Sequence, residues 1–474
     1  MSNTKAPDFF NKKEIPPPWE HQEKTKTIGL EKAQVLDLSD PGTGKTRAWL
    51  EVLSARLKIS GGKALVLATK STMKSAWADD ITRFTPELTF SIAYASNREK
   101  AFAKDADVYI INHDGIKWID KNQKLVFTKE RNFESLVIDE ITAYKHQTSQ
   151  RSKAMGRMAK KFKYRCGLTG TPVSNGILDI WHPMKLVDDG KRLGASYFKF
   201  RNTVCEPVQV GPDPTKHIKW VDREGSVEAV TDLLSDITVR HVFEKCVSIP
   251  PHNTYFKYFE LNPKHRKAYE MLKEHSVVPL ESGELTGFNR GIVTQKLLQL
   301  ASGAVYATPD TECDRITEVF TTERYELVGQ LVEERDQCVV AFAWKHQKEE
   351  LLKEFEKRKI TTAVLDGTIT SDIEREETIA SFQRGEIKAL LIHPKTGAHG
   401  LTLTAGTSTI WPSPIYDAEL FTQFNKRIYR GGQKRKTETV MVTAKGTIDE
   451  EVYDILRGKI EQMDTLLEMV AEEF

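Results

Sequence analysis

The sequence lacks any long hydrophobic run. No stretch of eighteen consecutive apolar residues occurs among its 474 residues, so we expect no membrane-spanning helix. The N-terminal stretch MSNTKAPDFFNKKEIPPPWE also has no apolar core of the kind that a signal peptide needs. Both absences predict a cytoplasmic protein without membrane contacts.

Cysteine is scarce, and none of the five cysteines is spaced as zinc ligands usually are. The odd number also argues against a disulfide framework. We therefore expect reduced thiols in the core of a cytoplasmic protein. The five residues are Cys166, Cys205, Cys246, Cys313 and Cys338.

A large excess of charge of either sign is missing as well, since the net charge is only +2. The total therefore does not indicate a polyanionic partner. The charge is nevertheless uneven, because RSKAMGRMAKKFKYR (151–165) and KRIYRGGQKRK (426–436) are locally basic. Either stretch could be a solvated helix face, so neither identifies a partner by itself.

What the sequence does contain is an alternation of short apolar runs with stretches of helical periodicity. This alternation predicts an α/β fold, with mostly parallel sheets flanked by crossover helices. The expected strands of the first half span 35–39, 64–69, 108–112, 135–139 and 164–169. Those of the second half span 338–344, 361–367, 389–393, 408–412 and 437–443.

A Pro-Pro pair at 250–251 separates the two halves, and an alternating strand begins after it. We therefore predict one domain over 1–250, a second over 251–456 and a C-terminal helix over 457–474. Two stretches fit neither sheet. We interpret 206–225 as a hairpin or protruding loop, and 279–291 as a flexible excursion.

The stretch SDPGTGKT (39–46) follows a predicted strand and opens a predicted helix. This is the setting of a phosphate-binding loop, in which backbone N–H groups and a helix N-terminus face phosphate oxygens. Lys45 would meet the outer phosphates and Thr46 would hold Mg²⁺, although Ser39 stands where the strict pattern has glycine. The alternative is a chance Gly-rich turn. The expected nucleotide contacts are Asp40, Pro41, Gly42, Thr43, Gly44, Lys45 and Thr46.

The stretch SLVIDEIT (135–142) is an apolar run that ends in two carboxylates. The C-terminal edge of a parallel sheet is where α/β proteins place ligands. We expect Asp139 to ligate Mg²⁺ through water and Glu140 to polarise the water that attacks the γ-phosphate. Alone, the pair could be an ordinary exposed strand end, but the phosphate loop upstream favours the catalytic interpretation.

The stretch QFNKRIYRGGQ (423–433) falls in a predicted helix that begins after the N-cap Asp417 and continues to Arg430. Gln423, Arg427 and Arg430 would share one stripe of that helix, beside an apolar stripe. Arginines at the flank of a packing face are expected at an edge between domains. Guanidinium groups there could grip phosphate.

Together with LTGTPVSNGILDIWHPM (168–184) and GAHGLTLTAGTSTI (397–410), these motifs occur in the order of superfamily-two helicase-like ATPases. The residues within these motifs resemble those of the Swi/Snf branch of that superfamily. The stretch LLSDITVRHVFEKCVSIPP (233–251) resembles the Arg-containing segment that closes the first lobe in this branch. The similarity covers about residues 14–456.

The resemblance implies two RecA-like lobes with ATP in the cleft between them, DNA bound across both lobes, and lobe closure coupled to hydrolysis. It implies that Arg427 and Arg430 are arginine fingers, which are worth roughly 10³–10⁵ in rate in GTPases. It also implies that Gln22 reads adenine, and Gln423 is a further expected nucleotide contact. The expected cofactors are ATP and Mg²⁺. By position, the expected DNA contacts are Lys70, Ser71, Asn112, His113, Thr396 and Gly397.

Several residues depart from the family pattern. Thr142 stands where histidine is common, while Lys426 and Tyr429 stand where aspartate and histidine are frequent. Gly431 replaces an aliphatic residue, and His399 lies among the glycines of its motif. None of these changes removes a catalytic group, so we expect an active ATPase.

The leading hypothesis is a DNA-dependent ATPase that translocates on double-stranded DNA, for remodelling protein–DNA or branched DNA structures in replication, recombination or repair. A strand-separating helicase is the first alternative, with 206–225 as a candidate splitting hairpin. A small-molecule P-loop kinase and a nucleotide-switched DNA-binding module without turnover are alternatives of other classes. The chain resembles compact family members of bacteria and their viruses. We therefore expect a monomer, in a bacterial or phage-infected cell, that is targeted by protein partners.

Overall fold

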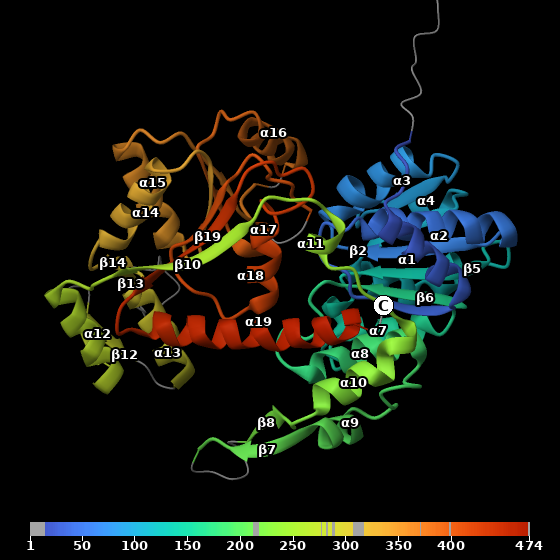
Figure 1. Cartoon of the computed structure of the whole chain (residues 1–474), viewed down its shortest axis with the longest axis horizontal. Coiled ribbons are helices and arrows are strands. Elements are labelled where there is room, and N and C mark those ends of the chain that lie inside the picture. Colours follow the sequence, from blue (N-terminus) through green and yellow to red (C-terminus); the bar gives the residue numbers. More distant parts are fainter. Residues whose placement is uncertain are drawn as a thin grey trace, which may run out of the picture.

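Two separate parallel sheets, each flanked by helices, organise the chain (Figure 1). The structure is a computed structural model, and it describes residues 15–211, 218–275, 277–280, 283–286, 290–306, 317–369, 371–397 and 400–472. The predicted α/β class and two-lobe arrangement are confirmed. We call the part of the chain around the first sheet the first lobe, and the part around the second sheet the second lobe.

The first sheet has seven strands in the order β3-β4-β2-β5-β6-β1-β9, and every neighbouring pair is parallel. Its strands are β1 (Gln34–Asp37), β2 (Lys63–Ala68), β3 (Phe90–Ala93), β4 (Val108–Asn112), β5 (Phe133–Asp139), β6 (Tyr164–Leu168) and β9 (Thr238–Val239). Its helices are α1 (Glu20–Glu31), α2 (Lys45–Ser60), α3 (Asp79–Phe84), α4 (Arg98–Ala103), α5 (Ile116–Lys121), α6 (Gln123–Val126), α7 (Gln150–Ala159), α8 (Trp181–Asp188), α9 (Tyr197–Val204), α10 (Ser226–Leu234) and α11 (Phe243–Cys246).

The second sheet has six strands in the order β10-β19-β18-β15-β17-β16, again all parallel. Its strands are β10 (His252–Phe259), β15 (Cys338–Ala341), β16 (Thr362–Leu365), β17 (Ala389–Ile392), β18 (Ser408–Trp411) and β19 (Thr437–Ala444). The helices are α12 (Pro263–His275), α13 (Arg290–Ala301), α14 (Glu323–Glu333), α15 (Lys345–Lys357), α16 (Asp372–Gln383), α17 (Pro394–Gly397), α18 (Ala418–Asn425) and α19 (Ile448–Glu472). Two short pairs, β11 (Val277–Leu280) with β12 (Gly283–Thr286) and β13 (Ala304–Tyr306) with β14 (Thr317–Val319), complete this lobe.

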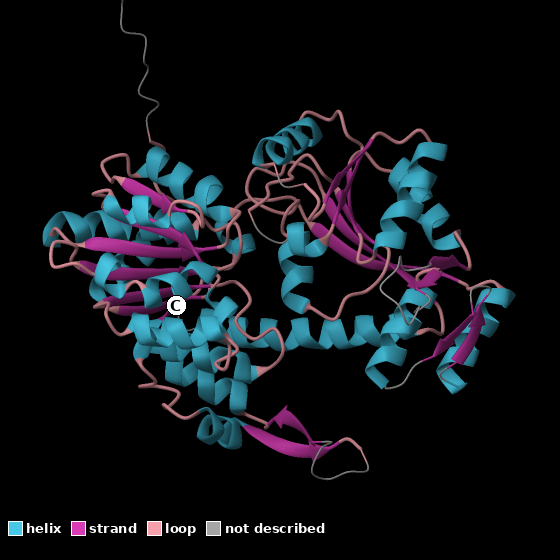
Figure 2. Ribbon diagram, turned by 180° about the vertical axis from the view of Figure 1, so that it is seen from behind, coloured by secondary structure: helices cyan, strands magenta, loops and turns pink. Residues whose placement is uncertain are grey.

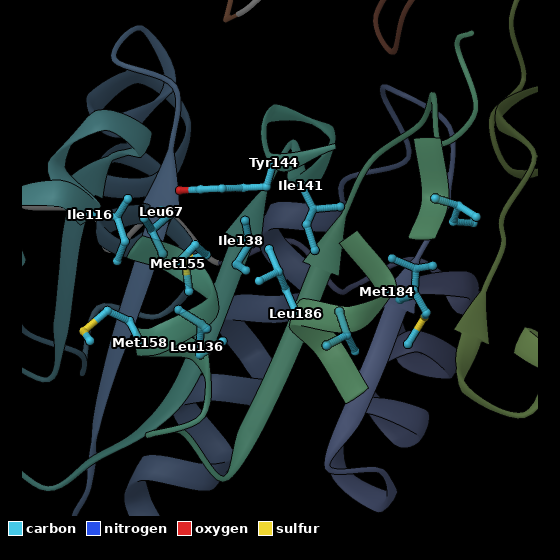
Figure 3. Packing of buried hydrophobic residues seen from close by; sticks show 14 of the residues in the cluster. Leu67, Ile116, Leu136, Ile138, Ile141, Tyr144, Met155, Met158, Met184 and Leu186 are labelled. Carbon is cyan, nitrogen blue, oxygen red and sulfur yellow. The ribbon is translucent and has the colours of Figure 1, made fainter. Parts of the chain in front are cut away.

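The first sheet is buried on both faces, as parallel sheets generally are. On one face Leu136 and Ile138 of β5 pack against Met155 and Met158 of α7 and against Leu186 of α8 (Figure 3). The opposite face packs against an apolar side of α2 and α3. This burial explains why the strands appear in the sequence as nearly continuous apolar runs rather than as alternating patterns.

The ten expected strands are all present, and two strands of the first sheet, β3 and β9, were not predicted. The predicted protrusion at 206–225 is an antiparallel hairpin, β7 (Cys205–Gln209) with β8 (Ile218–Asp222), which projects from the first lobe (Figure 1). The stretch 279–291 contains β12, while residues 281–282 and 287–289 lie outside the described residues. The predicted boundary near residue 250 falls between β9 and β10, and the exact division into domains stays a prediction.

The C-terminal helix α19 begins at Ile448, nine residues before the predicted start, and it crosses from one lobe to the other (Figures 1 and 2). Tyr453 and Leu456 in its first half belong to the core of the second lobe. In its second half, four residues belong to the core of the first lobe: Met463, Leu466, Leu467 and Val470. Within the described residues, no helix is both long and apolar enough to cross a bilayer.

Candidate active site

The stretch 39–46 links β1 to α2 as a tight loop, as the phosphate-loop interpretation requires. Gly42 and Gly44 adopt positive φ angles of 94° and 76°, which the loop needs in order to turn its N–H groups inward. The Lys45 amine donates to the carbonyl oxygens of Ser39 at 2.6 Å and of Asp40 at 3.1 Å. These two bonds hold the Lys45 amine over the loop, where the phosphate-loop interpretation expects it.

A distant segment holds this loop in place. The Asp40 carboxylate accepts a hydrogen bond from the Arg240 guanidinium at 2.6 Å and another from the Phe243 backbone N–H at 2.8 Å. Although burial opposes it, this pairing holds the pKa of Asp40 below its ordinary value. The Ser39 hydroxyl accepts from the backbone N–H of His241 at 3.1 Å, so the residue that departs from the loop pattern serves as an anchor. Sequence reasoning missed Arg240 and Phe243 as site residues, and their only signal was the resemblance of 233–251 to a lobe-closing segment.

Gln22 lies on α1 beside the end of the phosphate loop and is buried. Its amide nitrogen donates to the Gly44 carbonyl at 3.2 Å, and its amide oxygen accepts from the Trp19 N–H at 2.9 Å. A carboxamide can make four hydrogen bonds, so capacity for a base edge remains. The adenine-reading role of Gln22 stays a prediction.

The two carboxylates of the Asp-Glu motif follow β5 and face the phosphate loop. Asp139 accepts a hydrogen bond from the indole N–H of Trp77 at 3.0 Å, and Glu140 accepts from the Thr169 hydroxyl at 3.4 Å. Burial raises the pKa of both carboxyl groups. The positive charge of the Lys45 amine favours their ionised forms and so partly opposes this increase. Glu140 also has φ = 51°, an uncommon backbone conformation for a residue with a side chain. Trp77 is fully buried, as expected for a core residue, but its bond to Asp139 was not foreseen.

The predicted helix from Asp417 to Arg430 is correct at its start and wrong at its end. Asp417 caps α18 by accepting from the Leu420 N–H at 3.0 Å, but the helix stops at Asn425. Beyond Asn425 the Arg427 N–H donates to the Phe424 carbonyl three residues back, while the Gln423 carbonyl that a continuing helix would offer it accepts from Arg427 Nε. The predicted arginines therefore lie on a turn of residues 426–430, which we call the arginine turn.

Arg427 and Arg430 converge on one acceptor, the Leu401 carbonyl, at 3.3 Å and 2.8 Å. Burial and the neighbouring Arg430 charge together lower the pKa of Arg427 to about 9, although the negative charge of Glu140 in the first lobe partly opposes the decrease. Burial also lowers the pKa of Arg430, which Asp80 of the first lobe attracts. Each arginine thus interacts electrostatically with a carboxylate on the opposite lobe.

Gln423 lies on α18 next to the arginine turn and is fully buried. Its backbone carbonyl accepts from Arg427 Nε at 2.8 Å, whereas its side-chain oxygen has no hydrogen-bond partner among the described residues. A buried acceptor without a partner is costly. Its presence beside the arginine turn is consistent with the predicted contact to a polar ligand.

A second polar contact joins the lobes next to Glu140. The Thr142 hydroxyl donates to Glu419 of α18 at 2.9 Å, and the Lys145 amine donates to the same carboxylate at 3.3 Å. Thr142 is the residue that departs from the family histidine, and it still connects the Asp-Glu motif to the second lobe. Lys145 and Glu419 had no recognisable signal in the sequence.

A cavity of about 540 Å³ lies between the lobes on another side of this interface. Three of the six predicted DNA contacts line it, namely Lys70 and Ser71 from the first lobe and Thr396 from the second. The other three do not: Asn112, whose oxygen accepts from Arg98; His113, which is buried against Tyr144; and Gly397, which packs against Phe424. Lys74, Lys395 and Arg375 also line the cavity and were not predicted.

The β7–β8 hairpin lies far from this cavity. The cavity is bordered by the segments next to α3, α16 and α17, whereas the hairpin projects from the opposite side of the molecule, below α9 and α10 (Figure 1). A hairpin that splits DNA strands should lie beside the bound duplex. The strand-splitting role of this hairpin stays a prediction.

Comparison with known families gives two matches that together span most of the chain. A model of the SNF2-related domain matches residues 31–302, and a model of the helicase conserved C-terminal domain matches residues 323–432. The first match contains the phosphate loop, Asp139 and Glu140. The second contains the arginine turn.

Individual relatives agree with these matches. A phage protein, p41 of Acyrthosiphon pisum secondary endosymbiont phage 1, is 28% identical over 96% of this chain and 98% of its own length. A Bacillus subtilis protein named as an ATP-dependent helicase/translocase, YwqA, is 23% identical over 90% of this chain but only 46% of its own length. Among solved structures, the Sulfolobus solfataricus SWI2/SNF2 ATPase core in complex with dsDNA has a TM-score of 0.44 and 21% identity, over 96% of this chain and 94% of that chain.

Proposed function

The chain belongs to the SNF2-related family of ATP hydrolases, and from this premise we propose that it couples ATP hydrolysis to translocation along double-stranded DNA. One observation carries the proposal. The same two lobes supply both halves of the hydrolytic site and both walls of the basic cavity of about 540 Å³. A relative movement of the lobes would therefore change the hydrolytic site and the grip on a ligand in the cavity together.

The division of the hydrolytic site supports gating by lobe closure. Lys45 and Glu140 belong to the first lobe, while Arg427 and Arg430 belong to the second. A transferring phosphoryl group is stabilised by cations on several sides, so turnover requires both sets in place. Glu140, once ionised, is positioned to orient and polarise the attacking water. The Thr169 hydroxyl that donates to Glu140 fixes the direction of its carboxylate.

The donor set also fits a magnesium ion, which we propose as the second cofactor beside ATP. Mg²⁺ prefers oxygen ligands and usually binds through one or two carboxylates together with substrate phosphates. Asp139 and Glu140 are half-buried, and burial raises the pKa of both carboxyls, while the adjacent Asp139 charge also raises that of Glu140, so a cation in addition to Lys45 would stabilise their ionised forms. Asp139 and the Thr46 hydroxyl would hold the ion, whose charge would help to neutralise the phosphate oxygens.

Duplex DNA is the proposed ligand of the basic cavity. Exposed lysines on both walls, Lys70 and Lys395, and the hydroxyls of Ser71 and Thr396 are groups that contact phosphates without reading base sequence. Binding is therefore expected to depend on salt concentration and to tolerate any sequence. We propose that translocation along DNA serves to remodel protein–DNA complexes or branched DNA in replication, recombination or repair. The similarity to the Bacillus subtilis protein YwqA, which is named as an ATP-dependent helicase/translocase, supports the proposed translocation on DNA.

The test is the ATPase rate without nucleic acid and with duplex DNA, single-stranded DNA or RNA. We expect strong stimulation by duplex DNA, together with displacement of a third strand from a triplex that the protein must traverse. Equal rates under all four conditions would refute the motor assignment. Separation of a plain duplex into single strands would identify a helicase instead.

Variants of the arginine turn test the divided site. Arg427→Ala and Arg430→Ala are expected to keep ATP binding but to lose stimulated turnover, because both guanidinium groups act only when the lobes approach. ATP affinity and turnover are to be measured separately. Full stimulated activity in either variant would exclude that arginine as a finger.

A further inference from the structure

The arginine turn touches the first lobe through residues that no catalytic role explains. The Lys426 amine lies 3.1 Å from a carboxylate oxygen of Glu244, which belongs to α11 of the first lobe. The same amine lies 5.6 Å from the ring centre of Phe243 and 4.8 Å from that of Tyr429. Lys426 therefore sits between one carboxylate and two aromatic rings, an arrangement that suits a cation.

Tyr429 makes the second part of this contact. Its ring is buried and meets the Phe243 ring edge to face, with the centres 5.8 Å apart and the planes at 78°. Burial and the adjacent Glu244 carboxylate raise the pKa of Tyr429 to about 12. The His252 ring lies 5.0 Å away on the other side, and burial lowers the pKa of His252 to about 4, so this neighbour is uncharged.

Phe243 and Glu244 are adjacent to the phosphate loop, and Phe243 touches it directly. The Phe243 backbone N–H donates to Asp40 at 2.8 Å. Its ring packs so closely on Gly42 that a Cβ atom there would lie 3.0 Å from it. A continuous line of contacts thus runs from Lys426 and Tyr429, through Phe243, to the phosphate loop.

We propose that Lys426 and Tyr429 are positioning residues that hold the arginine turn in register with the phosphate loop when the lobes approach. The contact with Phe243 and Glu244 supplies a fixed point on the first lobe. Arg427 follows Lys426 directly in the chain, and Arg430 follows Tyr429, so each positioning residue sets the place of the arginine next to it. The inference rests on the proposed gating of hydrolysis by lobe closure and assigns residues to it.

Two features indicate that this contact orients the turn rather than stabilises the fold. The Glu244 side chain is 45% exposed, and a pair open to solvent on one side contributes little to stability. A cavity of about 650 Å³ adjoins the contact, and Glu244, His252, Lys426 and Tyr429 are among its lining residues. Because the turn has empty space beside it, loss of the contact leaves it room to shift, and a misplacement of about 1 Å can lower a catalysed rate roughly 10²-fold.

The test is a charge-reversal cycle in the full-length protein. Lys426→Glu and Glu244→Lys are each expected to lower kcat about tenfold or more, with the KM for ATP nearly unchanged, because nucleotide binding does not need the turn. The double variant restores the pair and is expected to regain kcat to within about threefold of the wild type. Lys445→Glu, which reverses a pair with Glu260 at 3.2 Å inside the second lobe, is the matched control and should leave kcat unchanged.

Rescue of kcat by the double variant shows that the two opposite charges act as a pair. Because a structural ion pair would be rescued in the same way, the Tm separates the two roles: for positioning residues it stays unchanged in each single variant while kcat falls. A Lys426→Glu variant with wild-type kcat, or a double variant no faster than the single ones, would overturn the proposal. Tyr429→Phe keeps the ring and removes the donor, so it should lower kcat in the same direction while folding normally; an unchanged kcat excludes the hydroxyl. If duplex DNA fails to stimulate the wild type, the translocase assignment falls, and the cycle is then decided on the unstimulated kcat.

Discussion

Replacing Arg427 by methionine should stabilise the nucleotide-free protein while it destroys turnover. The Arg427 side chain is buried, and none of the ion pairs found among the described residues includes it. Within the part of the chain that the structure describes, its guanidinium donates to two acceptors, the backbone carbonyls of Gln423 and Leu401. Methionine fills a similar volume without charge. Exchanging buried ionic groups for apolar residues of similar volume is often neutral or stabilising by about 1–4 kcal/mol.

The size of the expected gain in stability follows from the environment of the Arg427 side chain. Burial lowers the pKa of Arg427 from 12.5 to about 9. At 1.36 kcal/mol per pKa unit, holding the charge in this place costs roughly 5 kcal/mol. Bonds from a charged donor contribute about 1.5–3 kcal/mol each. Because the bond to the Leu401 carbonyl is long, at 3.3 Å, the two hydrogen bonds that the substitution removes offset an amount near the low end, about 3–4 kcal/mol of that cost. The expected net gain is about 1–2 kcal/mol, or roughly 2–8 °C in Tm for a unit of this size.

Calorimetry of the nucleotide-free protein, with and without an ATP analogue, measures the effect. Arg427→Met should melt at a higher temperature than the wild type, and its duplex-stimulated turnover should fall by about 10³-fold or more. Arg435→Met is the matched control, because Arg435 is exposed and paired with Asp336, so its Tm should change little. A lower Tm for Arg427→Met than for the wild type would refute the reasoning that this arginine is held at a cost for its function.

Three further predictions concern other parts of the molecule. Leu467→Ala, which removes a buried side chain of α19 from the first-lobe core, should cost about 2–5 kcal/mol of unfolding free energy in a denaturant titration; the exposed Ile455→Ala on the same helix should cost little, and equal effects would contradict the bridging role of α19. Because burial raises the pKa of Asp139, its carboxyl keeps a proton to higher pH, so Mg²⁺ binding followed by calorimetry should tighten as pH rises; a pH dependence that persists unchanged in Asp139→Asn would exclude Asp139 as its source. Lys70→Ala should weaken duplex binding equally for all sequences and reduce the slope of log K against log salt by about one, as measured by fluorescence anisotropy; an unchanged slope would remove Lys70 from the DNA contacts.

Local signals predicted the parts of this structure that depend on neighbouring residues in the chain. Strands buried on both faces produce continuous apolar runs, so β5 and the carboxylates at its end were recognisable. The phosphate loop was recognisable because its glycines, its lysine and the flanking strand and helix are contiguous. The N-cap Asp417 acts on the next turn of its own helix, and its role was correct for the same reason.

What the sequence could not predict depends on contacts between distant segments. Arg240 lies 200 positions from Asp40, and nothing in the local pattern pairs them. The chain leaves the helix after Asn425, and the turn that follows is held by the distant Leu401 and Leu403, whose backbone groups bond Arg427. The amphipathic pattern of α19 predicts that one face is covered, but it does not identify which lobe covers each half.

The path of α19 also limits how the two lobes can move relative to each other. The lobes are joined by the chain between β9 and β10 and again by this 25-residue helix, which at 1.5 Å per residue is about 37 Å long. A body held at two separate places keeps one easy degree of freedom, a rotation about the line through them. A buried ion pair between Arg324 and Asp449 fixes one end of the helix to the second lobe, and the first-lobe core holds the other end. The two attachments thus leave the lobes free to rotate about a single axis but restrain them from sliding or twisting apart.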